Sequence, residues 1–283
     1  MKVLVTGVKG QLGYDVVREL NKRGIAAIGC DKEEFDLTDK TQTVNYIAGS
    51  GADVVVHCAA YTAVDKAESD RDVCFAVNVE GTRNVVEACE KTGAKLVYFS
   101  TDYVFDGEGE KPWKTTDAPS PVNYYGETKL AGERAVRAYS KHFIIRISWV
   151  FGINGKNFVK TMLRLGREKD RLTVVSDQIG SPTYTVDLAR LVCDMIATEK
   201  YGTYHATNEG LCSWYEFAAE IMKEARLRCE IVPVTSDEYP TAAKRPHNSR
   251  LDKSELRKNG FEPLPEWKDA LRRYLEEIEN GTN

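Results

Sequence analysis

The sequence predicts an α/β protein with a doubly wound parallel sheet and a smaller C-terminal α/β part. Through the first 150 residues, short apolar runs alternate with segments of helical periodicity, which is the pattern of right-handed β-α-β units. After residue 152 this alternation becomes irregular, and the helix-periodic segments are separated by short strands. We therefore expect one domain over residues 1–150 and a second over residues 151–283, with segments of the second returning to the first.

The individual elements follow from apolar runs bounded by turn residues. Strands are expected at residues 2–6, 25–29, 53–57, 95–99 and 143–147. Helices are expected at residues 15–23, 39–48, 73–91, 124–139, 156–169, 186–198, 214–225 and 266–279.

A glycine-rich turn follows the first strand directly. It contains Gly7, Gly10 and Gly13, spaced three apart, and a helix-periodic run begins immediately afterwards. Gly7 and Gly10 would let the backbone turn tightly and approach a pyrophosphate, while Gly13 would let the helix pack against the strand. The N–H groups at the helix N-terminus attract phosphate. The turn predicts a dinucleotide-binding domain, although an ordinary strand–helix turn can also contain three glycines.

Composition sets limits on the class of protein. The 283 residues are 42% hydrophobic and 29% charged, as in soluble globular proteins. The net charge of -4 argues against nucleic acid and anionic membrane surfaces as partners. No apolar run approaches the roughly 18 residues of a membrane span, and the N-terminal residues resemble a strand rather than a signal peptide. Seven cysteines without a C-x-x-C pair favour the cytoplasm, and four scattered histidines argue against zinc, so no metal ligands are expected.

An acidic residue stands near the end of the second strand. Asp31 lies 24 residues after Gly7, close to the position of the acid that binds a ribose 2′-hydroxyl in dinucleotide folds. An acid there repels a 2′-phosphate and favours NADH, whereas the neighbouring Lys32 can hold that phosphate. Both NADPH and NADH therefore stay open, and a lone aspartate can also be a polar turn residue.

Candidate catalytic groups come from two segments. Thr101 and Asp102 follow the fourth strand, at the sheet edge where such folds bind ligands. Tyr125 and Lys129 are four residues apart on an expected helix and share one face. A nearby ammonium group lowers the pKa of a phenol, so Tyr125 would exchange a proton with a carbonyl oxygen as hydride arrives. A polar turn and an exposed helix face are the simpler alternatives.

The three glycines, Thr101 and the run Tyr125-Gly126-Glu127-Thr128-Lys129 together resemble an extended short-chain dehydrogenase/reductase, a superfamily with a Rossmann-type fold. Three stretches are more narrowly similar to the dTDP-4-dehydrorhamnose reductases, the RmlD or RfbD group. They are residues 58–68, 100–107 and 177–183, supported by residues 146–152 and 157–162. The resemblance covers nearly the whole chain.

The resemblance implies an NAD(P)H-dependent oxidoreductase that reduces the C4 ketone of dTDP-4-dehydro-L-rhamnose to dTDP-L-rhamnose, in nucleotide-sugar and surface polysaccharide biosynthesis. It makes Tyr125 the proton donor, Lys129 the group that tunes it and holds the nicotinamide ribose, and Thr101 a hydrogen-bond partner of the C4 carbonyl. It implies further cofactor contacts from Gln11, Leu12, Asp36, Leu37, Ala60, Tyr61 and Thr62, and sugar contacts from Asp102, Tyr103 and Trp149.

The second part of the chain offers two further substrate contacts. Arg245 lies in a basic stretch and would make charge-assisted hydrogen bonds to a diphosphate, although a solvated basic loop is as good an explanation. Gln178 lies in the Gly/Pro turn at residues 177–183, which would border the sugar-nucleotide pocket or shape the domain junction. Trp149 can also be a core residue instead of one that faces the sugar.

Two positions depart from the family pattern. Tyr61 stands where many members have histidine. Some relatives bind Mg²⁺ at a dimer interface through a glutamate early in the first helix, and this chain has the shorter Asp15 there. Mg²⁺ is therefore implied by the resemblance alone, and both a monomer and a homodimer stay open.

Two competing functions are also compatible with these residues. One is a reductase, epimerase or 4,6-dehydratase acting on another NDP-sugar. Dehydratase relatives have Thr-Asp-Glu after the fourth strand, whereas Tyr103 follows Thr101 and Asp102 here, which favours a simple reductase. The other is a non-catalytic, cofactor-binding regulatory subunit that resembles the β subunit of methionine adenosyltransferase.

Overall fold

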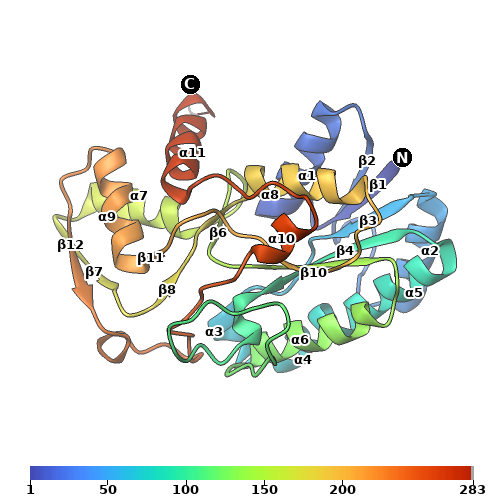
Figure 1. Cartoon of the computed structure of the whole chain (residues 1–283), viewed down its shortest axis with the longest axis horizontal. Helices are drawn as coiled ribbons and strands as arrows, with labels where there is room; N and C mark the ends of the chain where they lie inside the picture. Colours follow the sequence, from blue (N-terminus) through green and yellow to red (C-terminus); the bar gives the residue numbers. More distant parts are fainter. Residues whose placement is uncertain (282–283) are drawn as a thin grey trace.

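A six-stranded parallel sheet forms the centre of the molecule, and helices cover both of its faces (Figure 1). The structure is a computed structural model that describes residues 1–281. The strand order is β10-β5-β4-β3-β1-β2, and every neighbouring pair is parallel. The strands are β1 (Lys2–Thr6), β2 (Ala26–Cys30), β3 (Val54–His57), β4 (Lys95–Thr101), β5 (His142–Ile147) and β10 (Gly202–His205). The predicted doubly wound, Rossmann-type α/β fold is confirmed.

Alternate side chains of the strands supply two separate hydrophobic cores. On one face, Val3 and Val54 pack with Leu188 beneath α1 (Gln11–Lys22) and α8 (Thr185–Ile196). On the other, Leu4 and Val55 pack beneath α2 (Lys40–Ser50), α5 (Thr82–Thr92) and α6 (Tyr124–Arg137). Figure 1 shows α1 and α8 on one side of the sheet and α2, α5 and α6 on the other. Because both faces are covered, the strands are apolar throughout rather than alternating.

The helix expected at residues 73–91 differs from the prediction in one respect. It consists of α4 (Arg71–Phe75), a π-helical segment η1 (Ala76–Gly81) and α5, joined end to end. In the π-helical segment, the Asn78 side chain accepts a hydrogen bond from the Tyr61 N–H at 2.8 Å and donates to the Tyr61 carbonyl at 3.1 Å. These tertiary contacts accompany a local change of helical period that the apolar pattern did not reveal.

The second part of the chain surrounds its own aromatic core, which includes Phe151, Phe217 and Tyr274. Its longer elements are α7 (Phe158–Glu168), β7 (Arg171–Val175), α9 (Trp214–Glu224), β12 (Glu230–Val234) and α11 (Trp267–Gly281). Its short strands are β6 (Val150–Phe151), β8 (Ile179–Gly180), β9 (Thr183–Tyr184) and β11 (Cys212–Ser213). The remaining short helices within residues 1–281 are α3 (Val64–Ala67), η2 (Asp102–Val104), η3 (Ser236–Glu238) and α10 (Ser254–Lys258).

Residues after 150 also build the central domain, because α8 packs beside α1 and β10 forms an edge of the central sheet. Because the six strands are parallel, their carboxyl ends meet at one edge of the sheet, where ligands bind in such folds. None of the helices within residues 1–281 has the length and apolar character needed to cross a membrane.

We predict that Gly13→Ala destabilises the fold by about 1–3 kcal/mol, because an added Cβ would lie 2.4 Å from the Gly7 carbonyl oxygen and force α1 away from β1. The measurement is the free energy of unfolding in urea. Gly49→Ala is the matched control, since nothing lies within 4 Å of an added Cβ there. The control should stabilise α2 by roughly 0.5–1 kcal/mol. Equal effects of the two substitutions would contradict the close-packing argument.

Candidate active site

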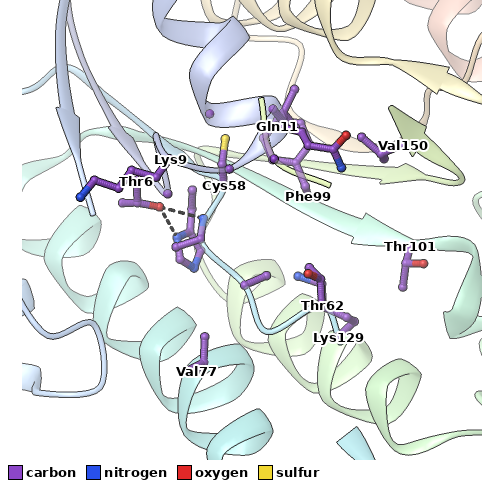
Figure 2. Close-up of a pocket in the computed structure, with 18 of the residues that line it drawn as sticks. Thr6, Lys9, Gln11, Cys58, Thr62, Val77, Phe99, Thr101, Lys129 and Val150 are labelled. Carbon is purple, nitrogen blue, oxygen red and sulfur yellow. Dashed lines mark hydrogen bonds between the residues drawn. The ribbon is translucent and has the colours of Figure 1, made fainter. Parts of the chain in front are cut away.

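A cavity of about 1140 Å³ follows the carboxyl edge of the sheet and extends to the second part of the chain. Figure 2 shows Gln11 and Val150 on one side of this cavity and Thr62 and Lys129 on the other. The cavity brings together most of the residues singled out in the sequence, namely Gly7, Gly10, Gln11, Leu12, Gly13, Asp31, Asp36, Leu37, Ala60, Thr62, Thr101, Asp102, Tyr103, Tyr125, Lys129 and Trp149.

The glycine turn lies against the end of β3. Gly7 has a positive φ of 69°, and an added Cβ would lie 2.7 Å from the Ala59 nitrogen. The Thr6 hydroxyl accepts the Ala59 N–H at 3.1 Å and lies 2.8 Å from Nδ1 of His57 (Figure 2). Burial lowers the pKa of His57 to about 3, so its ring is neutral. Helix α1 then begins without a side-chain cap or an acidic first turn, which leaves its N–H groups able to bind phosphate.

The far end of the cavity carries charges of both signs. The Asp31 carboxylate accepts hydrogen bonds from the backbone N–H groups of Lys9 at 3.1 Å and Lys32 at 2.9 Å. Lys9 also forms an ion pair with Glu33 at 2.6 Å. Asp31 is thus held at the cavity wall by the backbone, while two lysine side chains lie close by.

Helix α6 positions Tyr125 and Lys129. The Asn123 side chain caps the helix by accepting the Gly126 N–H at 2.8 Å. An added Cβ on Gly126 would lie 2.2 Å from the Tyr103 carbonyl oxygen, so the first turn of α6 packs directly on η2. The Tyr125 and Tyr103 rings meet edge to face at 5.7 Å, and the Lys129 Nζ lies 4.2 Å from the centroid of the Tyr98 ring.

Burial controls the charge states of both groups on α6. It raises the pKa of Tyr125 above that of an ordinary phenol, so the prediction of a lowered pKa beside Lys129 is wrong. Burial also lowers the pKa of Lys129 to about 7, which weakens the ammonium charge that the prediction relied on. Tyr125 therefore keeps its proton at neutral pH, as a proton donor must.

Thr101 and Asp102 form a hydrogen-bonded pair at the end of β4. The Thr101 hydroxyl donates to Oδ1 of Asp102 at 2.8 Å and accepts the Tyr103 N–H at 3.2 Å. Both side chains are buried and line the cavity. Burial raises the pKa of Asp102 to about 6.

The family model described as the RmlD substrate binding domain matches residues 1–280. The chain belongs to this family. It is 42% identical over 277 residues to the spore coat polysaccharide biosynthesis protein SpsK of Bacillus subtilis (strain 168), covering 98% of this chain and 97% of that one. It is 38% identical over 295 residues to the dTDP-4-dehydrorhamnose reductase of Escherichia coli (strain K12), covering 98% of each.

A solved structure agrees with this assignment. The dTDP-4-dehydrorhamnose reductase of Bacillus anthracis str. Ames in complex with NADP has a TM-score of 0.95 and 44% sequence identity, covering 98% of this chain and 100% of that one. The resemblance found in the sequence is therefore confirmed.

Three predicted contacts of this RmlD-family chain do not line the cavity. The Tyr61 hydroxyl donates to Asp70 at 2.9 Å on the outer surface. Gln178 donates to the Ser236 hydroxyl at 3.0 Å. Arg245 forms an ion pair with Asp65 at 2.7 Å. Their roles stay predictions.

Arg245 nevertheless approaches the site from the C-terminal loop, which connects η3 with α10. Burial raises the pKa of Tyr103 to about 12, and the Arg245 guanidinium acts in the opposite direction. Its Nε atom is buried and has no hydrogen-bond partner among residues 1–281. Arg245 therefore lies near Tyr103, with its buried Nε donor unpaired within the described residues.

Asp15, the candidate magnesium position of the family, is committed to other contacts. The carboxylate accepts a hydrogen bond from Arg18 at 2.9 Å within α1 and one from the Thr185 hydroxyl, and the contact with Thr185 joins α1 to α8. The described part of the chain contains no group of three or more His, Cys, Asp or Glu side chains that could hold a metal ion. The geometry around Asp15 thus gives no support to Mg²⁺ binding.

Sequence reasoning missed the side chains that fix Gln11. Its Oε1 accepts hydrogen bonds from the Gly152 N–H at 2.9 Å and from Nδ2 of Asn157 at 3.0 Å. Asn157 also caps α7 and contacts the Tyr274 hydroxyl at 2.9 Å. Its position one residue before a helix could have identified it as a cap, but no local signal connected it with Gln11.

A buried ion pair connects α6 with the central sheet. Arg146 on β5 makes two hydrogen bonds of 2.8 Å to Glu133, one turn after Lys129, and lies 3.3 Å from Nε2 of His205. Burial pushes the pKa of Glu133 upward, but the Arg146 guanidinium holds it below its usual value. The pair ties α6 to the central sheet.

We predict that Arg146→Met alone costs about 3–5 kcal/mol of the free energy of unfolding, because it removes the buried partner of the Glu133 carboxylate and leaves only the exposed Arg137 paired with it. The double variant Glu133→Leu/Arg146→Met should recover most of this loss in urea unfolding. Lys91→Met, which breaks the exposed pair with Glu87, is the control and should have little effect. A double variant no more stable than Arg146→Met would contradict the argument.

Proposed function

We propose that this chain reduces the C4 ketone of dTDP-4-dehydro-L-rhamnose to dTDP-L-rhamnose with a nicotinamide cofactor, in the synthesis of nucleotide sugars for surface polysaccharides. One observation carries the proposal: Thr101, Tyr125 and Lys129 line the same cavity as the glycine turn. Further support comes from the family match and from relatives named dTDP-4-dehydrorhamnose reductase over nearly the whole chain.

The residues along the sheet edge fit a dinucleotide. The N-terminus of α1 and its glycine turn would hold the diphosphate, with Gln11 and Leu12 beside it. Asp31 would hold the ribose next to the adenine, and Asp36 and Leu37 would border the adenine itself. Ala60 and Thr62 would line the middle of the cofactor, and Lys129 would hold the nicotinamide ribose. Tyr61, whose hydroxyl binds Asp70 outside the cavity lining, would contribute only through its backbone between these two residues. When bound, the cofactor supplies a hydride to C4 of the sugar.

The side chains at the end of β4 and on α6 complete the reaction. The Tyr125 phenol carries its proton at neutral pH and gives it to the C4 carbonyl oxygen, which becomes the hydroxyl of the product. The Thr101 hydroxyl binds the same oxygen and stabilises the negative charge that develops on it. Lys129 stabilises the phenolate that remains on Tyr125.

The sugar nucleotide would occupy the part of the cavity nearest the second half of the chain. Asp102, Tyr103 and Trp149 would face the sugar. Trp149 has a positive φ of 51° and stacks on Trp214 at 3.8 Å, so its ring is fixed at the cavity wall. Arg245 would bind the diphosphate through the donor left free beside Tyr103, and Gln178 would border the same region.

We propose use of both NADPH and NADH, because Asp31 disfavours a 2′-phosphate whereas the neighbouring Lys32 favours it. A cytoplasmic location fits the seven free cysteines. The proposal holds for a monomer or a homodimer.

We predict that Tyr125→Phe lowers kcat by about 10²–10⁴-fold, because it removes the proton donor. The assay follows NADPH or NADH oxidation with dTDP-4-dehydro-L-rhamnose. Tyr124→Phe is the matched control, since the Tyr124 ring lies against Arg71 at 4.4 Å and outside the cavity lining. No substrate-dependent oxidation by the wild type would favour a cofactor-recycling epimerase or dehydratase, or a regulatory subunit. An unchanged rate in Tyr125→Phe would remove its assigned role.

We predict that Lys32→Ala lowers kcat/KM for NADPH about tenfold more than for NADH, because only NADPH carries a 2′-phosphate for this cation to bind. The comparison uses initial rates at limiting cofactor. Lys22→Ala, an exposed lysine at the end of α1, should leave the ratio unchanged. Equal losses with the two cofactors in Lys32→Ala would show that Lys32 does not read the phosphate.

A further inference from the structure

The Thr101 hydroxyl is fully committed while Asp102 is ionised. A hydroxyl has one proton to donate and two lone pairs that accept. Here the proton goes to Oδ1 of Asp102 at 2.8 Å, and one lone pair takes the Tyr103 N–H at 3.2 Å. One lone pair is left, and it cannot bind a carbonyl oxygen, which is itself an acceptor. The role that the proposed reaction gives to Thr101 therefore conflicts with this arrangement.

Protonation of Asp102 resolves the conflict. A neutral carboxyl group with its proton on Oδ1 would donate to the Thr101 oxygen and fill its second lone pair. The Thr101 proton would then be free to point into the cavity that both residues line. The other carboxyl oxygen, Oδ2, is buried without a hydrogen-bond partner in the described chain, as suits a group whose charge is poorly stabilised.

We propose that Asp102 is a positioning residue whose proton determines whether the Thr101 hydroxyl donates to the carboxylate or to the carbonyl oxygen of the substrate. The proposal rests on the reductase function above. It adds a second protonation requirement to the reaction, because Tyr125 must hold its proton for transfer and Asp102 must hold one to release Thr101.

The surroundings of Asp102 favour a carboxyl group that is neutral in mildly acidic solution. Two phenols face it, Tyr103 from η2 and Tyr125 from α6, and the Ser249 hydroxyl approaches from the C-terminal loop. Arg245 lies beyond Tyr103 and is paired with Asp65. Burial outweighs the stabilising effect of the nearby Ser249 and Thr101 hydroxyls and raises the pKa of Asp102 to about 6. The Thr101 hydroxyl therefore stops donating to Asp102 as the pH falls through this value, and it donates to the carboxylate again as the pH rises.

The first test compares kcat at pH 5.5 and pH 7.5 with saturating NADPH and dTDP-4-dehydro-L-rhamnose. We expect kcat of the wild type to be roughly tenfold or more higher at the lower pH. In Asp102→Asn this ratio should shrink, because the amide N–H₂ donates to the Thr101 oxygen at every pH. The fall in charge of Lys129 near its pKa of about 7 contributes equally to both proteins, so the difference between the ratios isolates Asp102.

The matched control is Asp106→Asn in the same loop, whose side chain accepts the Glu108 N–H outside the cavity lining. It should keep the ratio of the wild type. An Asp102→Asn protein that keeps the ratio of the wild type would overturn the proposal. The proposal would also be overturned if Asp102→Asn reduced the ratio of kcat values by the same factor in the Thr101→Val protein as in the wild type. Asp102 would then not act through Thr101.

The second test needs neither substrate nor cofactor. Carbon-13 NMR of labelled aspartate gives the pKa of Asp102 in the wild type and in Thr101→Val. We expect a pKa near 6 that rises further when the Thr101 hydroxyl is removed, because this hydroxyl stabilises the carboxylate. A pKa that does not respond to Thr101→Val would overturn the coupling. If the pKa of Asp102 rises in Thr101→Val as expected but the wild type oxidises no NADPH at either pH, the proposed function is overturned instead.

Discussion

The contact between the turn after β1 and the end of β3 is the constraint on which the site depends. Gly7 adopts a positive φ and lies so close to Ala59 that no side chain fits between them. Thr6 closes the same junction through His57 and the Ala59 N–H. This junction fixes the N-terminus of α1, the segment after β3 and the end of the sheet relative to one another. The glycine turn and the face of α6 that carries Tyr125 and Lys129 can then line one cavity.

The second half of the chain shares a hydrophobic core with the first through α8, and it completes the cavity wall through polar contacts. Gln11 in the glycine turn is held by Gly152 and Asn157, and Asn157 also contacts Tyr274 in the C-terminal helix. Asp15 connects α1 to α8 through Thr185. Because these contacts involve side chains at the cavity wall, changes in the second half of the chain can alter the geometry of the cofactor site.

Burial has opposite consequences for charged groups on the two sides of α6. The Arg146 guanidinium pairs with Glu133 and holds the pKa of this carboxyl group below its usual value, so Glu133 stays ionised. Facing the cavity, Lys129 and Asp102 have no such partner, and burial moves the pKa of each toward its neutral form. Tyr125 keeps its proton for the same reason. Two groups that line the cavity, Lys129 and Asp102, thus have pKa values of about 7 and about 6.

The sequence by itself determined the parallel α/β fold, the glycine turn and the shared face of Tyr125 and Lys129, because apolar periodicity, turn chemistry and helical spacing are local properties. Only the tertiary structure decided that Gln11 is held by Asn157, that Tyr61 and Gln178 lie outside the cavity lining, and that η1 is π-helical. It also reversed the expected pKa shift of Tyr125. These features depend on contacts between distant segments and on the loss of water around buried groups, and neither is encoded in the spacing of neighbouring residues.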